Sequence, residues 1–387
     1  MERRARMAVR HLLAPGAQVD RPEQVVDGIL ALHATDPATV HLSALIRLRG
    51  GTVGAVEEAL YERRSLVRIL GMRRSMFVVG LDVAPIVQAA CSVSVAAAQR
   101  RRLVMLLGGA GVGPDVEGWL VDVERSVLAA VRARGGATAQ ELARDEPRLR
   151  TSLVMAEGKP YEAVQNITSR VLFQLAAEGH IVRGRPQGGW TTNNYVWSPI
   201  ESWLPGGMPE LDTATARVEL VQRWLATFGP APLEDLKWWT GLGVRDLRAA
   251  LAVIRPVEVD LEGGAIGLVL ADDVDAVEAP GPWAALLPGL DPMPMGWHER
   301  SWFLPPDISS RVMDRTGNIG PTVWWDGHVV GGWSQRRDGE IVYRLLEDVG
   351  AEAGVAVAAA AATLTERIGT ARVTPRFPAP LDRELTA

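Results

Sequence analysis

A histidine and a threonine separated by a single alanine are the side chains best placed to do chemistry. They are His33 and Thr35, and Asp36-Pro37 follows them directly. A neutral imidazole can accept a proton or a hydrogen bond from a water molecule, and a hydroxyl can accept a second bond. Asp36 could add negative charge, although an aspartate before a proline is most simply a helix N-cap. The alternative for His33 is a core histidine bonded to a carbonyl, with Thr35 supporting the cap.

Two predicted helices position this corner. Asp20 is a suitable N-cap for the first helix, and Pro22 fits its first turn. His33 follows Ile29 at i+4 and continues the apolar face of that helix. The second helix begins at Pro37. We therefore expect the corner to lie beside a helix N-terminus, whose free amide groups favour a polar or anionic guest.

Composition narrows the class of protein. The 387 residues are enough for several domains, and 47% of them are hydrophobic. There is no run of eighteen apolar residues, and the basic N-terminal segment is not followed by an apolar core, so we expect a cytoplasmic protein without membrane contacts. The single cysteine, Cys91, excludes an intramolecular disulfide. The six histidines lack metal-ligand spacing and no nucleotide-binding glycine motif follows a strand, so we expect no metal and no cofactor.

The chain repeats one order of elements. Helices are predicted at 117–133, 137–145 and 161–178, and an extended hairpin with a basic, glycine-rich tip follows through 179–197. Three helices followed by such a hairpin are typical of a winged helix, whose tip is the wing. The order recurs over 212–270, with a turn at Gly263-Gly264. It is less regular in the first third, where strands are predicted at 66–70 and 76–79 with an arginine-containing turn between them.

The last third has a different pattern. Asp326-Gly327 is a strong hairpin-turn signal between two tryptophan-rich strands, and residues 352–368 form a predicted helix. We predict an α+β protein: three tandem winged helices and a C-terminal β-barrel-like domain, curved into a C-shape with His33, Arg183 and Arg185 on its concave face. The predicted domains span residues 1–112, 113–205, 206–278 and 279–387.

Several segments together resemble the AlkZ/YcaQ group of bacterial DNA glycosylases. The landmarks are the His33–Pro37 corner, residues 286–292 and 295–300, Asp314-Arg315, and the hairpin at 324–333. In that family the corner carries a catalytic Gln-apolar-Gln or Gln-apolar-Asp motif, and this chain has His33 and Thr35 at those positions. The resemblance implies tandem winged helices, a C-terminal β-barrel and a catalytic role for His33, Thr35 and Asp36.

The implied reaction suits these side chains. The ring of an N7-alkylated purine already carries a positive charge, so it takes the electrons of the glycosidic bond and leaves as a neutral base without an acid to protonate it. The enzyme must position a water and stabilise charge on the sugar. We therefore predict a monofunctional, monomeric DNA glycosylase that excises bulky or crosslinked N-alkylpurines from double-stranded DNA, in DNA repair or in self-resistance to a genotoxic natural product. Undamaged bases should be poor substrates.

Basic side chains are the expected DNA contacts, and the hairpin at Asp326-Gly327 could enter a groove beside the lesion. Asp291 is expected to anchor a loop through Arg300. Two alternatives to an enzyme are a non-catalytic winged-helix DNA-binding or regulatory protein and a protein that sequesters a small genotoxic ligand. The expected DNA-binding residues are Arg73, Arg74, Arg183, Arg185, Arg300, Arg315, His328, Arg336 and Arg337.

Overall fold

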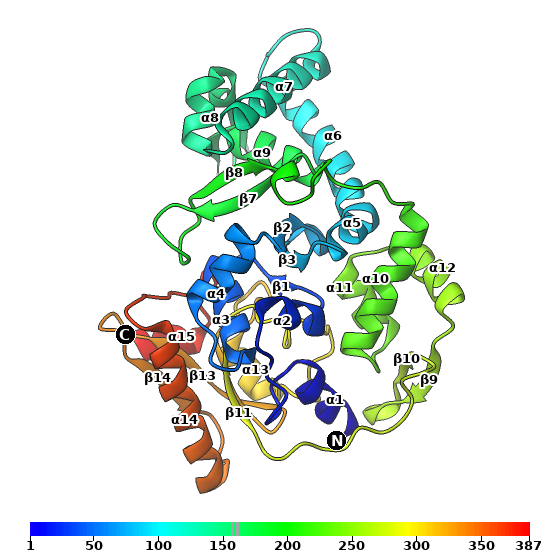
Figure 1. The fold of residues 1–387 in the computed structure, drawn as a ribbon, viewed down its shortest axis with the longest axis vertical. Coiled ribbons are helices and arrows are strands. Elements are labelled where there is room, and N and C mark those ends of the chain that lie inside the picture. The colour runs from blue at the N-terminus through cyan, green and yellow to red at the C-terminus, as the bar shows by residue number, and fades with distance from the viewer. Residues whose placement is uncertain (156–157, 160–161) are drawn as a thin grey trace.

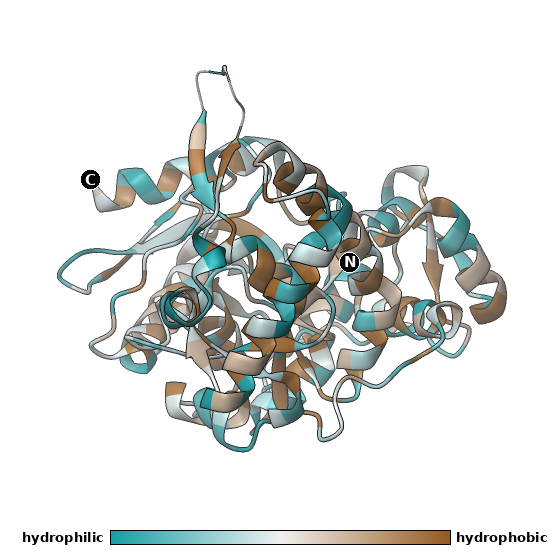
Figure 2. Cartoon of the chain, turned by 90° about the horizontal axis from the view of Figure 1, so that it is seen from above, coloured by the Kyte–Doolittle hydropathy of each residue, from teal (hydrophilic) through white to brown (hydrophobic). Residues whose placement is uncertain are grey.

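The computed structural model describes residues 1–155, 158–159 and 162–387, and it combines helices with small antiparallel sheets (Figure 1). Hydrophobic and hydrophilic residues alternate along the helices and strands (Figure 2), and buried apolar side chains form the core. In the described part of the chain, no helix is long and apolar enough to cross a membrane.

The corner is built differently from the sequence prediction. Helix α2 (Pro22–Ile29) is capped by Arg21 and Gln24 rather than by Asp20. It ends at Leu30, which has a φ of 66°. The chain then forms the short strand β1 (Leu32–His33). The prediction that His33 extends the helical face is therefore wrong, because the left-handed Leu30 breaks the helix and β1 pairs with a distant strand.

That partner is the central strand of a three-stranded antiparallel sheet, ordered β1-β3-β2. Strands β2 (Leu66–Leu70) and β3 (Met76–Gly80) are fully buried and confirm the two strands predicted here. Helix α3 (Pro37–Arg47) begins after Asp36 as predicted. The remaining helices of this part are α1 (Glu2–Arg10), α4 (Val53–Glu57), α5 (Val83–Val87) and α6 (Val93–Gly109).

The next part lies at the upper end of the molecule in Figure 1 and contains three helices followed by a hairpin. Strand β4 pairs with β8, which pairs with β7. The third helix, α9, is shorter than predicted because strands β5 and β6 pair before it begins. Tyr161, where that helix was predicted to start, lies outside the described residues. The bounds are α7 (Val116–Arg134), β4 (Ala137–Thr138), α8 (Ala139–Asp145), β5 (Ser152–Met155), β6 (Ala163–Asn166), α9 (Thr168–Ala177), β7 (Ile181–Pro186) and β8 (Tyr195–Pro199).

The third repeat of this order matches the sequence prediction. Gly263 and Gly264 form the predicted turn at φ values of 81° and 80°, which glycine adopts without steric cost. Its elements are α10 (Thr213–Phe228), α11 (Leu233–Thr240), α12 (Val244–Ile254), β9 (Val257–Asp260) and β10 (Ile266–Val269).

The C-terminal sheet is open rather than closed. Its four antiparallel strands run in the order β11-β12-β13-β14, and no pairing joins the two outer strands among the described residues. The predicted β-barrel is therefore corrected to an open sheet, which α14 and α15 cover instead. The predicted turn at Asp326-Gly327 is confirmed. The bounds are β11 (Ala284–Leu287), α13 (Pro306–Val312), β12 (Thr322–Trp325), β13 (His328–Gln335), β14 (Ile341–Leu345), α14 (Gly350–Ile368) and α15 (Pro380–Thr386).

A buried ion pair joins α3 to the loop after β11. Arg47 and Asp291 are both fully buried, with nitrogen–oxygen distances of 2.7 and 2.8 Å, and Ser43 Oγ donates to the same carboxylate at 2.6 Å. Asp291 therefore anchors its loop as expected, but through Arg47 and not through Arg300. The reason is that Arg47 extends from the last turn of α3 directly into the core.

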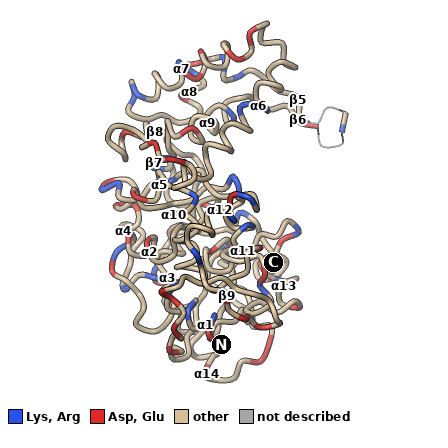
Figure 3. Tube along the Cα trace, turned by 90° about the vertical axis from the view of Figure 1, so that its right-hand side faces the viewer, with Lys and Arg blue, Asp and Glu red and all other residues tan. Residues whose placement is uncertain are grey.

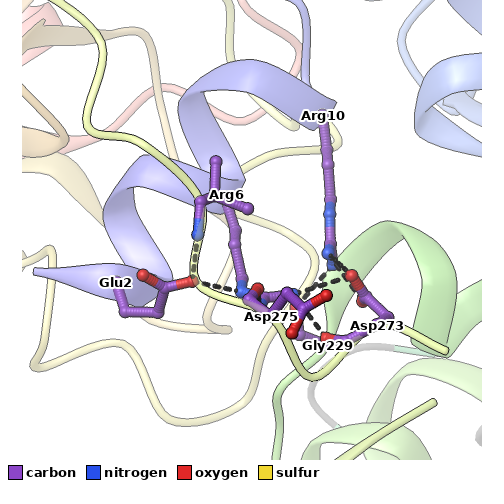
Figure 4. A network of polar contacts seen from close by, with 7 residues as sticks. Glu2, Arg6, Arg10, Gly229, Asp273 and Asp275 are labelled. Carbon is purple, nitrogen blue, oxygen red and sulfur yellow. Dashed lines mark hydrogen bonds and ion pairs between the residues drawn. The ribbon is translucent and has the colours of Figure 1, made fainter. Parts of the chain in front are cut away.

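A second network holds the N-terminal helix in place (Figure 4). Arg6 donates to Asp273 at 2.8 Å, and Arg10 donates to the Gly229 carbonyl at 2.8 Å. Glu2 accepts from Arg6 at 2.7 Å. These contacts attach α1 to the end of α10 and to the segment after β10.

Candidate nucleic-acid interface and catalytic corner

His33 is a buried, neutral histidine. Its side chain lies edge-on to Phe77, its partner in the sheet, with 5.2 Å between the ring centroids. Burial, together with the nearby Arg73 guanidinium, lowers the pKa of His33 to about 4. The imidazole is therefore uncharged at pH 7, as the predicted role in water positioning requires. Nδ1 accepts a long hydrogen bond of 3.4 Å from the Thr35 backbone N–H.

A small cavity adjoins His33. Its volume of about 20 Å³ is sufficient for one water molecule. Arg73 and Ser75 give it polar walls beside the imidazole. The full lining is Ala31, His33, Met72, Arg73, Ser75, Phe77, Trp239, Pro292 and Met295.

Asp36 acts as a helix cap. One carboxylate oxygen accepts from the Ala38 N–H at 3.0 Å, and the other accepts from the Arg376 N–H at 2.9 Å. Burial raises the pKa of Asp36, and these hydrogen bonds oppose the rise. The half-buried Thr35 presents its carbonyl to the Arg376 guanidinium at 3.1 Å. Both oxygens of Asp36 thus have structural partners, in agreement with the capping interpretation.

Arg376 connects this corner to a large basic cleft. The cleft has a volume of about 530 Å³, and no aspartate or glutamate is among the described residues that line it. It lies where α6, α9 and the β7–β8 hairpin meet, and Figure 3 shows basic positions along α6. Three aromatic residues, Phe173, Tyr195 and Trp197, also line it. Its arginines are Arg74, Arg102, Arg170, Arg183 and Arg376.

The two arginines predicted on the wing have different surroundings. The Arg183 guanidinium lies 5.3 Å from the ring centroids of both Tyr195 and Trp197 and faces the cleft. Burial lowers the pKa of Arg183, and it forms no ion pair with the described residues. Arg185 instead pairs with Glu62 at 2.7 Å and Glu57 at 3.3 Å. Arg183 is therefore available to an anion, whereas Arg185 joins the hairpin to the first part of the chain.

The loop between β7 and β8 reaches the corner. Asn193 Oδ1 lies 3.5 Å from the Arg376 guanidinium, and Trp190 packs on His41 of α3 with 5.1 Å between ring centroids. The predicted basic wing and the predicted catalytic corner are thus neighbours. They are far apart in the sequence, and Arg376 lies between them.

The remaining predicted DNA contacts are dispersed. His328, at the tip of the C-terminal hairpin, lies 3.4 Å from an Arg4 nitrogen of α1, so this tip packs against the protein. Arg336 pairs with Glu340 at 2.8 Å. Arg315 is exposed beside a separate hollow, and Arg337 is exposed in the turn after β13. Arg73 and Arg300 both lie on the Trp238 ring.

Sequence reasoning did not select three of the cleft arginines. Arg102 belongs to a visible run of three arginines on α6, and Arg170 lies in the first turn of the third helix, which is the usual groove reader. Those two signals could have identified them. Arg376 lies in an irregular C-terminal segment without any pattern, so only the fold reveals its position.

No group of three or more His, Cys, Asp or Glu side chains that could hold a metal occurs in the described ranges. Burial raises the pKa of the Cys91 thiol to about 12, which makes a thiolate nucleophile unfavourable.

A cleft lined by arginines and aromatic side chains is typical of a nucleic-acid-binding protein. The family model described as DNA glycosylase AlkZ-like matches residues 26–367, so this chain belongs to the AlkZ-like DNA glycosylase family. The structure is similar to that of Streptomyces sahachiroi DNA glycosylase AlkZ, with a TM-score of 0.72 and 20% sequence identity over 97% of this chain and 99% of that chain. None of the curated proteins matches significantly in sequence. The predicted family resemblance is confirmed, and the structural likeness shows a shared fold.

The turn that carries Arg73 and Arg74 gives a first prediction. Both residues have left-handed backbones, with φ values of 54° and 60°. We expect Arg74→Gly to raise the free energy of unfolding by about 1 kcal/mol, since glycine adopts this conformation without the steric cost. It should also weaken DNA binding, because Arg74 lines the cleft. Arg255→Gly is the matched control: Arg255 has a φ of 55° at the end of α12 and does not line the cleft. Equal DNA affinity for the two variants would contradict this assignment.

Proposed function

We propose that this protein is a monofunctional DNA glycosylase that hydrolyses the N-glycosidic bond of N7-alkylated purines in double-stranded DNA. The observation that carries the proposal is the arginine-lined cleft beside the His33 corner, connected to it by Arg376. Five guanidinium groups, with no carboxylate among the described residues of the lining, suit a phosphate backbone, and the aromatic side chains offer surfaces on which bases can stack. Family membership supports the reaction type.

In the proposed mechanism His33 and Thr35 position the attacking water. His33 lines the cavity that would hold this water, whereas Thr35 does not line it, so its hydroxyl would contact the water from outside the cavity. The water would occupy the cavity beside His33. To accept its proton at Nε2, the imidazole takes the Nδ1–H tautomer and gives up the long contact to the Thr35 N–H. Asp36 fixes the corner as a helix cap and contributes its charge to the electrostatic field at the sugar. No group in this arrangement protonates the leaving base, so we expect selectivity for bases that are already cationic.

We further propose that the three repeats of helices and hairpin are winged helices, within the domains 1–112, 113–205 and 206–278, followed by a C-terminal domain over 279–387. The repeated element order supports this division. The open, basic cleft would admit a bulky or crosslinked N-alkylpurine, and repair of such lesions would suit self-resistance to a genotoxic product. The proposed working form is a monomer on DNA.

Base release tests the proposed reaction. A duplex with a single N7-methylguanine is incubated with the protein, and abasic sites are detected as strand breaks that form only after alkali treatment. We expect such breaks at the modified position and none at an unmodified guanine. A protein that binds this duplex without generating abasic sites would instead be a non-catalytic DNA-binding protein. The replacement of the family's glutamine by His33 is the observation that favours that second candidate.

The salt dependence of binding tests the cleft. Five phosphate contacts predict a slope of about −4 to −5 in a plot of log K against log salt concentration. Arg183→Ala should reduce the magnitude of this slope by about one unit, because one phosphate contact is lost. Arg185→Ala, the matched control on the same strand, should leave the slope nearly unchanged, since Glu57 and Glu62 already neutralise Arg185. Identical effects of the two variants would contradict a phosphate-binding role specific to Arg183.

A further inference from the structure

Two arginines share one indole ring close to the corner. The Arg73 guanidinium carbon lies 3.9 Å from the Trp238 ring centroid, and the Arg300 guanidinium carbon lies 5.0 Å from it. Arg73 comes from the turn between β2 and β3, Trp238 from α11, and Arg300 from the loop after β11. Three segments that are far apart in the sequence therefore bring two positive charges together.

Among the residues that the structure describes, neither guanidinium group has an acidic partner within ion-pair distance. Arg300 donates from Nε to the Trp297 carbonyl at 3.0 Å, and the hydrogen-bond partners of its terminal nitrogens among the described residues are the sulfur atoms of Met295 and Met313, at 3.8 and 3.9 Å. Arg73 forms no ion pair with any of the residues that the structure describes. Burial, reinforced by the charge of Arg73, lowers the pKa of Arg300 to about 10. The two guanidinium groups therefore repel each other in a partly desolvated place, which an anion would relieve.

The carboxylate whose charge acts on Arg300, that of Asp235, has other partners. Asp235 Oδ1 accepts from the backbone N–H groups of His298 and Glu299 at 2.9 Å, and Oδ2 lies 3.9 Å from Arg3. Its attraction stabilises the charged form of Arg300, but no hydrogen bond joins the two side chains among the described residues. A place for an external anion therefore remains.

Arg73 and Arg300 lie close to the cavity beside His33. Arg73 lines the cavity that contains His33 and Ser75, and Met295 lines the same cavity while contacting Arg300. The backbone of Arg73 is left-handed, a conformation unfavourable for a residue with a Cβ, and such strain is found preferentially at functional positions. The cavity is thus bordered, on the side where Arg300 lies, by a strained arginine that forms no ion pair within the described ranges.

We propose that Arg73 and Arg300, held by Trp238, form a phosphate-binding site that takes a backbone phosphate next to the target nucleotide and so places its sugar beside His33. This inference rests on the proposed function. Guanidinium groups bind phosphate through paired N–H donors, and the indole ring fixes the side chains in advance. Arg73 and Arg300 are positioning residues here, since they contact the phosphate and not the bond that breaks.

A double-mutant cycle of binding affinities, in which an arginine and a DNA phosphate are altered separately and together, tests this site without relying on catalysis. The probes are duplexes with one tetrahydrofuran abasic analogue, in which the phosphate on its 5′ or its 3′ side is either natural or a neutral methylphosphonate. At one of the two positions, the neutral group should weaken binding to the unaltered protein about tenfold or more. Arg300→Gln should weaken binding to the natural duplex by a similar factor. For this variant, replacing the phosphate with methylphosphonate should weaken binding by less than about a further twofold, because the contact is already gone.

Three variants complete the cycle. Arg73→Gln, which alters an exposed residue, should behave as Arg300→Gln does, and Arg300→Lys should recover part of the affinity. Arg311→Gln is the matched control, because the Arg311 side chain is 38% exposed and pairs with Glu384 at 2.8 Å. Its affinity should fall as much as that of the unaltered protein when the phosphate is replaced by methylphosphonate. If both Arg73→Gln and Arg300→Gln respond to the neutral phosphates as strongly as the unaltered protein does, the site is refuted. If the protein releases bases but the arginine variants respond to methylphosphonate as the unaltered protein does, the phosphate site alone is overturned. If the variants lose that response but the protein releases no base, the proposed reaction alone is overturned.

Discussion

Asp291→Ala is expected to lower the free energy of unfolding by about 3–5 kcal/mol, because it leaves the Arg47 guanidinium buried without a counter-charge. Both side chains are fully buried, and Asp291 also accepts hydrogen bonds from Ser43 Oγ and from the Met293 N–H. The measurement is the urea midpoint of unfolding, followed by circular dichroism.

The control for this variant is an exposed ion pair of the same chemistry. Asp20 and Arg49 are 3.6 Å apart with side chains 68% and 64% exposed, so Asp20→Ala should cost no more than about 1 kcal/mol. If Asp291→Ala were as stable as Asp20→Ala, the ion pair would not be what joins α3 to the C-terminal part of the chain.

His33→Ala should reduce the rate of base excision by about 10²–10⁴-fold, the usual contribution of a side chain that handles a proton in the transition state. DNA affinity should change little, because His33 is outside the lining of the basic cleft. Single-turnover excision with excess protein measures the rate, and fluorescence anisotropy of labelled duplex measures the affinity. Thr35→Ala should cost less, about 1–3 kcal/mol in the activation free energy, since it removes one hydrogen bond.

Two further variants separate catalysis from folding. His33→Gln restores the residue type implied by the family motif and should retain or increase activity. His180→Ala removes a histidine whose side chain is 49% exposed and should leave the rate unchanged. If His33→Ala unfolds, or if it excises bases as fast as the unaltered protein, His33 is a core residue and the assignment fails.

The low pKa of His33 also predicts the pH dependence of the reaction. Because burial and Arg73 hold that pKa at about 4, the imidazole is already neutral at pH 6 and remains so at pH 8. The excision rate should therefore be nearly constant across this range and should fall only as the pH approaches 4. A steep loss of activity between pH 7 and pH 6 would show that the catalytic group has an ordinary histidine pKa.

Local signals predicted much of the fold. The cap at Asp36 and the helix after it, the third repeat and the hairpin at Asp326-Gly327 all depend on residues close in sequence, and the structure contains each of them. Pairing between distant segments was not predictable in this way. Strand β1 forms because β3 offers a partner more than forty residues away. The C-terminal sheet is open, and α14 and α15, which lie far from β11 and β12 in the sequence, pack on it.

The candidate site, like the fold, was predictable only where it depends on residues close in sequence. The motif at His33 was visible in the sequence, whereas the position of Arg376, which contacts Thr35 and Asp36 from the far end of the chain, was not. Residue type also did not distinguish Arg183 from Arg185, because their roles depend on whether Glu57 and Glu62 lie nearby. Acidic partners contributed by other segments therefore decide which arginines are available to DNA.

Release of the free base is the most direct test of the central claim. Purified protein, in excess over a duplex containing one N7-methylguanine, is sampled over time, and the small-molecule fraction is analysed by mass spectrometry. The proposed mechanism predicts that N7-methylguanine appears in step with alkali-labile abasic sites, that guanine is not released from the unmodified duplex, and that both products are strongly reduced with His33→Ala. Stable binding to the modified duplex without any release of N7-methylguanine by the unaltered protein would contradict it.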